Sequence, residues 1–239
     1  MAPEAPRHAS SGRTVIGIDA GLAFGGGDHP SSFLCLRALG WLTRFRQFRR
    51  VLDVGVGSGL LSIEVLKTWP AQVTAFDVNP FVTAKAQQYI RANHVAPRVR
   101  VSYEAGGKAH RLPRGTRFEL ALVNLNYAEL AAYAPALARA ALPGGMVLLS
   151  GLGTYHERYV AAAYAAHGFA LRNKFRQDGW SSLVMQARRA KCARGGRRRR
   201  PVAPHFPNLR CSSQATPSFP VRLAAIAGPS PVKSIRAAL

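Results

Sequence analysis

One short stretch, VLDVGVGSGLL at residues 51–61, constrains the fold more than any other part of this sequence. Its apolar start is typical of a buried strand, and the residues after its glycines, LLSIEVLKTW, are typical of a helix. Between them Gly55, Gly57 and Gly59 leave the backbone bare, which allows a ligand to approach closely. The stretch therefore predicts a strand, a glycine-rich turn and a helix that together face a nucleotide-type ligand.

The same alternation of strand and helix continues to residue 187. Six more strands are expected, over residues 72–77, 98–104, 118–124, 146–151, 169–175 and 180–187. Helices are expected over residues 81–94, 128–142 and 156–168, with Asn79 and Pro80 opening the first, Pro135 inside the second, and PGG stopping the second. This order predicts the α/β class: a Rossmann-like, doubly wound, mostly parallel seven-stranded sheet with a terminal antiparallel strand.

Charge and proline content separate a tail from this domain. Residues 188–239 hold 12 of the 33 Lys and Arg, seven of the 16 prolines and no acid, and they show no periodicity. We therefore expect a flexible N-terminus over 1–15, one domain over 16–187 and a basic, Pro-rich, disordered tail over 188–239. The tail is either an inert extension or a salt-sensitive RNA contact through Arg197–Arg200, and the basic body also favours an anionic partner.

Compartment and metal content follow from what the sequence lacks. No apolar run is long enough to span a bilayer, and the first residues have no signal-peptide core, so no membrane association is expected. The three cysteines form neither a CxxC pair nor a metal-ligand spacing, so we expect no metal and a reducing, cytoplasmic setting. The oligomeric state stays open.

The spacing of the glycines narrows the choice of ligand class. A dinucleotide fingerprint starting at Gly55 would need Gly or Ala where Leu60 stands. The spacing G-x-G-x-G after the acid Asp53 resembles instead the first motif of class I S-adenosylmethionine methyltransferases. Asp77 ends the second strand, where a carboxylate can accept hydrogen bonds from both ribose hydroxyls. The alternative for Asp77 is a helix-capping carboxylate.

Several motifs in one order narrow the resemblance further. They are IDAGLAFGGGDHPSSFLCL, VLDVGVGSGLLSIEVLK, DVNP, VNLN, LPGGMVLLSGL and DGWSSLVMQ. From Ile16 to Ala187 the chain resembles the ribosomal protein L11 methyltransferase family. That resemblance implies S-adenosyl-L-methionine as the cofactor. The residues it assigns to cofactor binding are Phe24, Ser32, Asp53, Gly55, Gly57, Gly59, Asp77 and Asn124.

The sequence also departs from the family pattern. Ala20, Gly26 and Asp28 replace a proline and two threonines of the glycine-rich loop, and Val56 replaces the cysteine of the first motif. The family usually carries an N-terminal domain that captures the substrate, whereas only about 15 residues precede the loop here. These departures leave the acceptor protein and the strength of cofactor binding open.

Asn124 is the candidate catalytic residue. Its amide oxygen, at the end of a strand, can accept N–H bonds from an acceptor amine and so orient the nitrogen lone pair. The expected function is an S-adenosylmethionine-dependent protein N-methyltransferase acting on lysine or α-amino groups, with a protein substrate such as a ribosomal protein. One alternative is a truncated, non-catalytic paralogue that binds the cofactor or a ribosomal particle.

A second alternative is an RNA or DNA amino methyltransferase. The basic composition supports it, and the stretch VNLNY, with Asn126 and Tyr127, contains an N-x-x-Y spacing that loosely resembles the signature of such enzymes. Three neighbouring residues keep structural alternatives. His29 is expected to bond the backbone at a helix start, Asn126 to cap a helix, and Tyr127 to form a pocket wall or part of the core.

Overall fold

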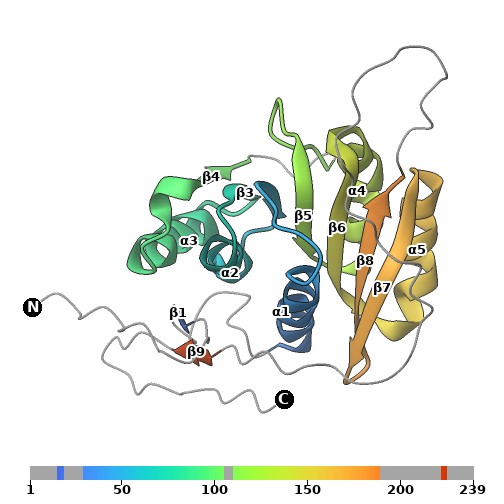
Figure 1. Ribbon diagram of the computed structural model, residues 1–239, viewed down its shortest axis with the longest axis horizontal. Helices are drawn as coiled ribbons and strands as arrows, with labels where there is room; N and C mark the ends of the chain where they lie inside the picture. Colours follow the sequence, from blue (N-terminus) through green and yellow to red (C-terminus); the bar gives the residue numbers. More distant parts are fainter. Residues whose placement is uncertain (1–14, 19–28, 105–109, 189–221, 225–239) are drawn as a thin grey trace, which may run out of the picture.

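The central feature of the fold is a seven-stranded sheet with the strand order β4-β3-β2-β5-β6-β8-β7 (Figure 1). The computed structural model describes residues 15–18, 29–104, 110–188 and 222–224. The strands of the sheet are β2 (Arg50–Val54), β3 (Gln72–Asp77), β4 (Val99–Tyr103), β5 (Phe118–Asn124), β6 (Ala141–Gly153), β7 (Phe169–Gln177) and β8 (Trp180–Ala187). Strands β2 to β6 are parallel, and β8 is antiparallel to both β6 and β7. The predicted fold class, including the antiparallel strand that ends the domain, is confirmed.

Helices cover both faces of this sheet (Figure 1). They are α1 (Pro30–Leu42), α2 (Leu60–Thr68), α3 (Pro80–Ala92), α4 (Tyr127–Ala140) and α5 (Glu157–Ala166), with 3-10 turns η1 (Ala96–Arg98) and η2 (Thr154–His156). One apolar cluster joins α1, α2 and α3 to one face, and a second joins α4 and α5 to the other. Burial of both faces explains why the central strands are apolar along their length rather than alternating.

The helix starts follow from local sequence. Asn79 caps α3 by accepting hydrogen bonds from the N–H groups of Phe81 and Val82. Asn126 caps α4 in the same way, and Nδ1 of His29 accepts from the N–H of Ser31 at the start of α1. The structural interpretations of these three residues are therefore confirmed.

The predicted end of the helix before β6 is wrong. Helix α4 ends at Ala140, before the PGG segment, and β6 begins at once with Ala141. Ala141 pairs with Phe118, and the register shifts before Leu120 pairs with Met146. The irregular ladder accommodates the proline and glycines inside the strand, where periodicity alone would place a loop.

A second, two-stranded sheet joins distant parts of the chain. Strand β1 (Val15–Gly17) pairs in parallel with β9 (Arg222–Ala224). The three residues of β9 belong to the tail over 188–239 for which the sequence predicts disorder. The rest of that tail, the first 14 residues, and residues 19–28 of the glycine-rich loop with Phe24 lie outside the described residues. Within the described ranges, no helix is long and apolar enough to cross a membrane.

Candidate active site

The sheet brings together residues from three sequence motifs. Strands β3, β2 and β5 are neighbours, and Val54 is in register with both Phe76 and Val123. The carboxyl ends of the three strands therefore meet at one edge. Asp77 ends β3, the glycine-rich turn follows β2, and Asn124 ends β5. In open α/β sheets, ligands bind at such an edge.

The turn after β2 requires its glycines. Gly55, Gly57 and Gly59 have φ values of 73°, 54° and 81°, in the left-handed region that side chains disfavour. A Cβ atom added to Gly55 would also lie 2.7 Å from Cδ2 of Leu125. The N–H of Gly55 donates to the carbonyl of Phe76 at 3.0 Å, which fixes the turn against β3.

Asp77 faces this turn. Its Oδ2 accepts a hydrogen bond from the N–H of Gly57 at 3.2 Å, and its Oδ1 accepts from the N–H of Asn79 at 3.1 Å. Each oxygen of an ionised carboxylate has a second lone pair, so Asp77, which is half-buried, can accept two further hydrogen bonds. Because Asn79 caps α3, the alternative role of Asp77 as that helix cap is wrong.

Asp53 lies beneath the turn rather than in front of it. Its side chain is 2% exposed, and its Oδ2 accepts a hydrogen bond from Oγ of Ser62 at 2.6 Å. Burial raises the pKa of Asp53 to about 7, the negative charge of Asp77 adds to the rise, and the bond from Ser62 opposes it. The carboxylate therefore ties β2 to α2 under the glycines.

Asn124 lies on the other side of the turn. Among the described residues its half-buried side chain has no hydrogen-bond partner, so its amide can bind a ligand. Its Oδ1 lies above Gly151 of β6, where an added Cβ would be 3.1 Å from that oxygen and 2.3 Å from the carbonyl oxygen of Leu125. Gly151 is thus a site residue that we did not single out from the sequence, although it stands within the LPGGMVLLSGL motif.

The start of α1 is fastened to the same edge. The carbonyl of Ser31 accepts a hydrogen bond from Oγ of Ser150 at 2.9 Å, and Ser150 is the β6 partner of Asn124. The ring of His29 packs edge-on against Trp180, with 4.5 Å between centroids. Ser32, in the first turn of α1, is 2% exposed. The predicted residue Ser32 thus lies on a helix turn anchored beside the candidate site.

A group of rings, which we call the aromatic cluster, includes Tyr127, three residues after Asn124. It consists of Tyr127, Tyr155, His156 and Tyr159. Tyr127 stacks on His156 with 3.5 Å between centroids and 14° between planes, and Tyr155 and Tyr159 lie beside this pair. Tyr127 is 40% exposed, Tyr155 81% and Tyr159 58%, so Tyr127 is not a core residue. Only Tyr127 was singled out from the sequence, because the partners follow a different strand.

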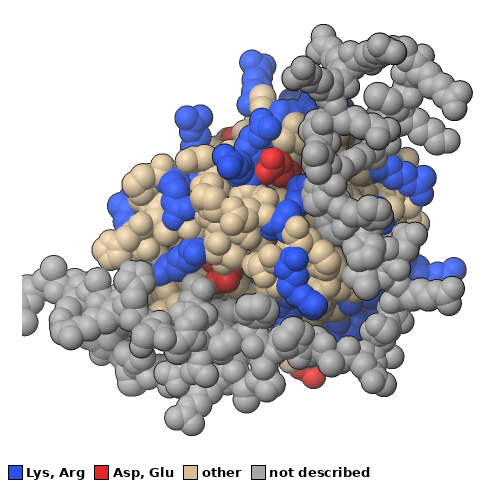
Figure 2. Space-filling view, in the orientation of Figure 1, with Lys and Arg blue, Asp and Glu red and all other residues tan. Residues whose placement is uncertain are grey.

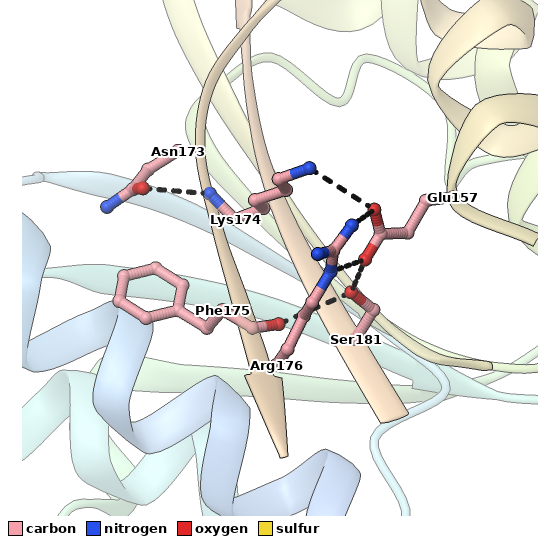
Figure 3. A network of polar contacts seen from close by, with 6 residues as sticks. All are labelled: Glu157, Asn173, Lys174, Phe175, Arg176 and Ser181. Carbon is pink, nitrogen blue, oxygen red and sulfur yellow. Dashed lines mark hydrogen bonds and ion pairs between the residues drawn. The ribbon is translucent and has the colours of Figure 1, made fainter. Parts of the chain in front are cut away.

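A charged network holds Glu157, the first residue of α5, against β7 and β8 (Figure 3). Arg176 of β7 donates to both carboxylate oxygens of Glu157, at 2.5 and 2.6 Å. Lys174 lies 3.5 Å from the same carboxylate, and the hydroxyl of Ser181 donates to it. The hydrogen bonds from Arg176 are the main reason that the pKa of Glu157 falls to about 2. Because Glu157 directly follows His156, the network fixes the backbone that carries Tyr155, His156 and Tyr159 of the aromatic cluster.

Comparison with known proteins identifies the family of this chain. A model described as "Ribosomal protein L11 methyltransferase (PrmA)" matches residues 2–188. Proteins named ribosomal protein L11 methyltransferase from Caulobacter sp. (strain K31) and Bradyrhizobium diazoefficiens are 35% and 37% identical, over 71% and 72% of this chain. The chain spans 58% of the length of each of these two relatives.

The likeness extends to the fold. The solved structure of a ribosomal protein L11 methylase from Lactobacillus delbrueckii subsp. bulgaricus superposes with a TM-score of 0.64 at 24% identity, covering 73% of this chain and 86% of that one. The matched region holds the glycine-rich turn, Asp77 and Asn124. With the motif order and the sheet topology in agreement, the chain belongs to the ribosomal protein L11 methyltransferase family.

Proposed function

We propose that this protein is an S-adenosylmethionine-dependent protein N-methyltransferase that modifies lysine or α-amino groups. One observation carries the proposal: the ends of the neighbouring strands β2 and β5 bring a glycine-rich turn and Asn124 to one edge of the sheet. In that turn the N–H of Gly57 donates to Asp77, and the amide of Asn124 has no hydrogen-bond partner within the described residues. Membership of the ribosomal protein L11 methyltransferase family supports the same reaction.

The residues at the sheet edge fit S-adenosyl-L-methionine. The unused lone pairs of Asp77 suit the two ribose hydroxyls. Gly55, Gly57 and Gly59 give the cofactor bare backbone to approach, and Ser32 in α1 and Phe24 are the further residues proposed to bind it. Asp53 takes a positioning role in this proposal, because its buried carboxylate reaches Ser62 and not the edge.

Methyl transfer asks little acid–base chemistry of the protein. S-adenosyl-L-methionine supplies a methyl group already activated on a sulfonium sulfur. The protein must therefore hold a neutral acceptor amine in line with that group and exclude water. Asn124 accepts an N–H bond from the amine and orients its lone pair. Burial of a lysine amine lowers its pKa and favours the neutral form that attacks.

The aromatic cluster is the proposed contact for the acceptor chain. Tyr127 begins α4 three residues after Asn124, and its ring is both exposed and supported by His156. Tyrosine faces bind alkyl chains and ammonium groups, so a lysine side chain can lie along the ring before it loses its proton. The proposed acceptor is a cytoplasmic protein, and the names of the relatives make a ribosomal protein the first to test.

The experiment combines a binding and a transfer measurement on the full chain. Calorimetric titration with S-adenosyl-L-methionine is expected to show binding in the micromolar range. Bacterial ribosomes, separated ribosomal proteins and ribosomal RNA are then incubated with methyl-labelled cofactor. Label recovered as methylated lysine or α-amine supports the proposal. Label recovered only in nucleosides would replace it with the nucleic-acid alternative, and absence of binding would replace it with the non-catalytic one.

A further inference from the structure

Two adjoining hollows lie away from the candidate active site, and both are rich in arginine. One has a volume of about 400 Å³ and the other about 380 Å³, and they share the turn Pro113–Thr116. We call their basic lining the arginine surface. It consists of Arg50, Arg100, Arg111, Arg114, Arg117 and Arg139.

The fold explains why this surface is open. Arg50 of β2, Thr74 of β3 and Arg100 of β4 lie on one face of the sheet, since Thr74 is in register with Arg100 and with Leu52 two positions after Arg50. This is the face that α4 and α5 cover further along the sheet. Helix α4 ends nearby, with Arg139 lining one hollow, so the outer strands are covered here by the segment before β5 rather than by a helix.

That segment is itself folded. Both the N–H and the hydroxyl of Thr116 donate to the carbonyl of Pro113, at 3.2 and 2.6 Å. Gly115 completes the turn with a φ of 74°. Arg114 lies inside this tight turn and Arg117 directly follows it, so their backbone positions are fixed, which reduces the entropy that binding would cost.

The charge of the arginine surface is not compensated. All six arginines are exposed, and within the described part of the chain none of their guanidinium groups has an ion-pair partner. No described Asp or Glu lines either hollow. Two carboxylates lie nearby: Glu119 accepts from the N–H groups of Arg49 and Arg50, and Glu104 accepts from Ser102. On the face drawn in Figure 2, Lys and Arg cover far more of the surface than Asp and Glu do.

The arginine surface and the candidate active site lie at opposite ends of the strands. Arg50 begins β2 and Arg117 precedes β5, whereas the glycine-rich turn and Asn124 follow the same two strands. A molecule bound by the arginines would therefore leave the edge with Asp77 and Asn124 accessible. The arginine surface is thus suited to anchoring a partner rather than to presenting the group that is modified.

We propose that the arginine surface binds the phosphate backbone of RNA. Guanidinium groups match phosphate oxygens in pairs, and six of them spread over β2, β4, the segment before β5 and the end of α4 suit a polymer of phosphates. Thr74 and Gln72, between the arginines, add polar groups for sugar hydroxyls. A single phosphate would engage one or two of the six arginines, whereas a strand of RNA engages the whole surface. This proposal does not depend on the methyltransferase activity.

The test measures RNA affinity of the full chain, because the basic tail contributes equally to every variant. The probe is a fluorescein-labelled single-stranded RNA of mixed sequence, about 20 nucleotides long. The surface variant is R100Q/R114Q/R117Q. The control variant, R44Q/R91Q/R158Q, removes the same charge from three exposed arginines elsewhere. Thermal unfolding and titration with S-adenosyl-L-methionine check that each variant is folded.

We expect the surface variant to bind RNA about tenfold more weakly at ~0.1 M salt, and its plot of log affinity against log salt to be shallower by about 2, for three lost phosphate contacts. The control should stay within about twofold of the unchanged protein. Equal losses in both variants, or no loss in the surface variant, would overturn the proposal. A competition experiment gives a further outcome that would overturn the proposal: poly-glutamate displacing the labelled RNA as well as unlabelled RNA of equal charge does. The arginine surface would then fit an acidic protein.

Discussion

The backbone N–H of Gly57 donates a hydrogen bond to Oδ2 of Asp77 at 3.2 Å, joining two motifs that stand 20 residues apart. The bond sets the distance between the glycine-rich turn and the carboxylate before any ligand arrives. The protein then loses less conformational freedom when it binds a ligand that touches both residues. Disturbing either residue should therefore affect affinity for the cofactor more than it affects folding.

Replacing Asp77 tests this pairing. Asp77→Asn keeps an acceptor for the backbone but removes the charge that strengthens bonds from hydroxyl groups. We expect S-adenosyl-L-methionine to bind about tenfold more weakly, which is about 1.4 kcal/mol, and more weakly still to Asp77→Ala. The control is Asp178→Asn, because asparagine tolerates the φ of 50° at that position and the same charge is lost. Equal affinities for the two asparagine variants would remove Asp77 from the proposed site.

Replacing Gly151 tests the close approach of β6 to Asn124. An alanine Cβ there would lie 2.3 Å from the carbonyl oxygen of Leu125, and φ is 87°. Gly115→Ala is the matched control, because φ is 74° and nothing lies within 4 Å of the added atom. We expect denaturant unfolding to show a loss of about 1 kcal/mol for Gly115→Ala and at least about twice that for Gly151→Ala. Similar losses would mean that only backbone strain matters at Gly151.

Tyr127 should affect methyl transfer without affecting the cofactor. Tyr127→Ala removes the ring that stacks on His156, so we expect a raised KM for the acceptor protein and an unchanged Kd for S-adenosyl-L-methionine. Tyr127→Phe keeps the ring and should behave like the unchanged protein. Steady-state kinetics with labelled cofactor measure both parameters. An unchanged KM for the acceptor in Tyr127→Ala would show that the aromatic cluster does not bind the acceptor.

Glu157 should stabilise the protein only above acidic pH. Its folded pKa is about 2, below the ordinary value of 4.5, so its contribution is complete above about pH 5 and disappears as the pH falls towards 2. We expect Glu157→Gln to cost about 1 kcal/mol at pH 7, because Arg176 is 52% exposed and solvent screens the pair. Denaturant unfolding at pH 7, 4 and 2.5 should show the two proteins converging. A constant difference would assign the cost to packing alone.

Asp53 should behave in the opposite sense. Its folded pKa of about 7 lies above the ordinary 3.8, so its protonated form stabilises the fold at low pH and that contribution is lost as the pH rises through 7. Relative to Asp53→Asn, the unchanged protein should lose stability between about pH 4 and 7, by at most about 1.4 kcal/mol per pH unit. Ser62→Ala removes the bond that favours the charged form and so raises the folded pKa further, and the loss of stability should therefore extend to higher pH. A flat difference would mean that Asp53 titrates normally.

Much of this architecture could be predicted because its causes are local. The apolar runs of β2, β3, β5 and β8 define strands, and both asparagine caps are visible as Asn79 before Pro80 and Asn126 before α4. The glycine spacing, Asp77 and Asn124 were also identified as candidates, since each stands at the end of an apolar run. Their cofactor and catalytic roles stay predictions until the binding and transfer experiments are done.

What the sequence determined by itself was therefore the order of strands and helices and the residues that follow each strand. Only the tertiary structure decided which of those ends meet. The start of β6 at Ala141, ahead of the PGG segment, the need for Gly151, the stacking of Tyr127 on His156 and the arginine surface all depend on contacts between separate elements. Periodicity reports which face of an element is buried, but it carries no information about the element that covers that face.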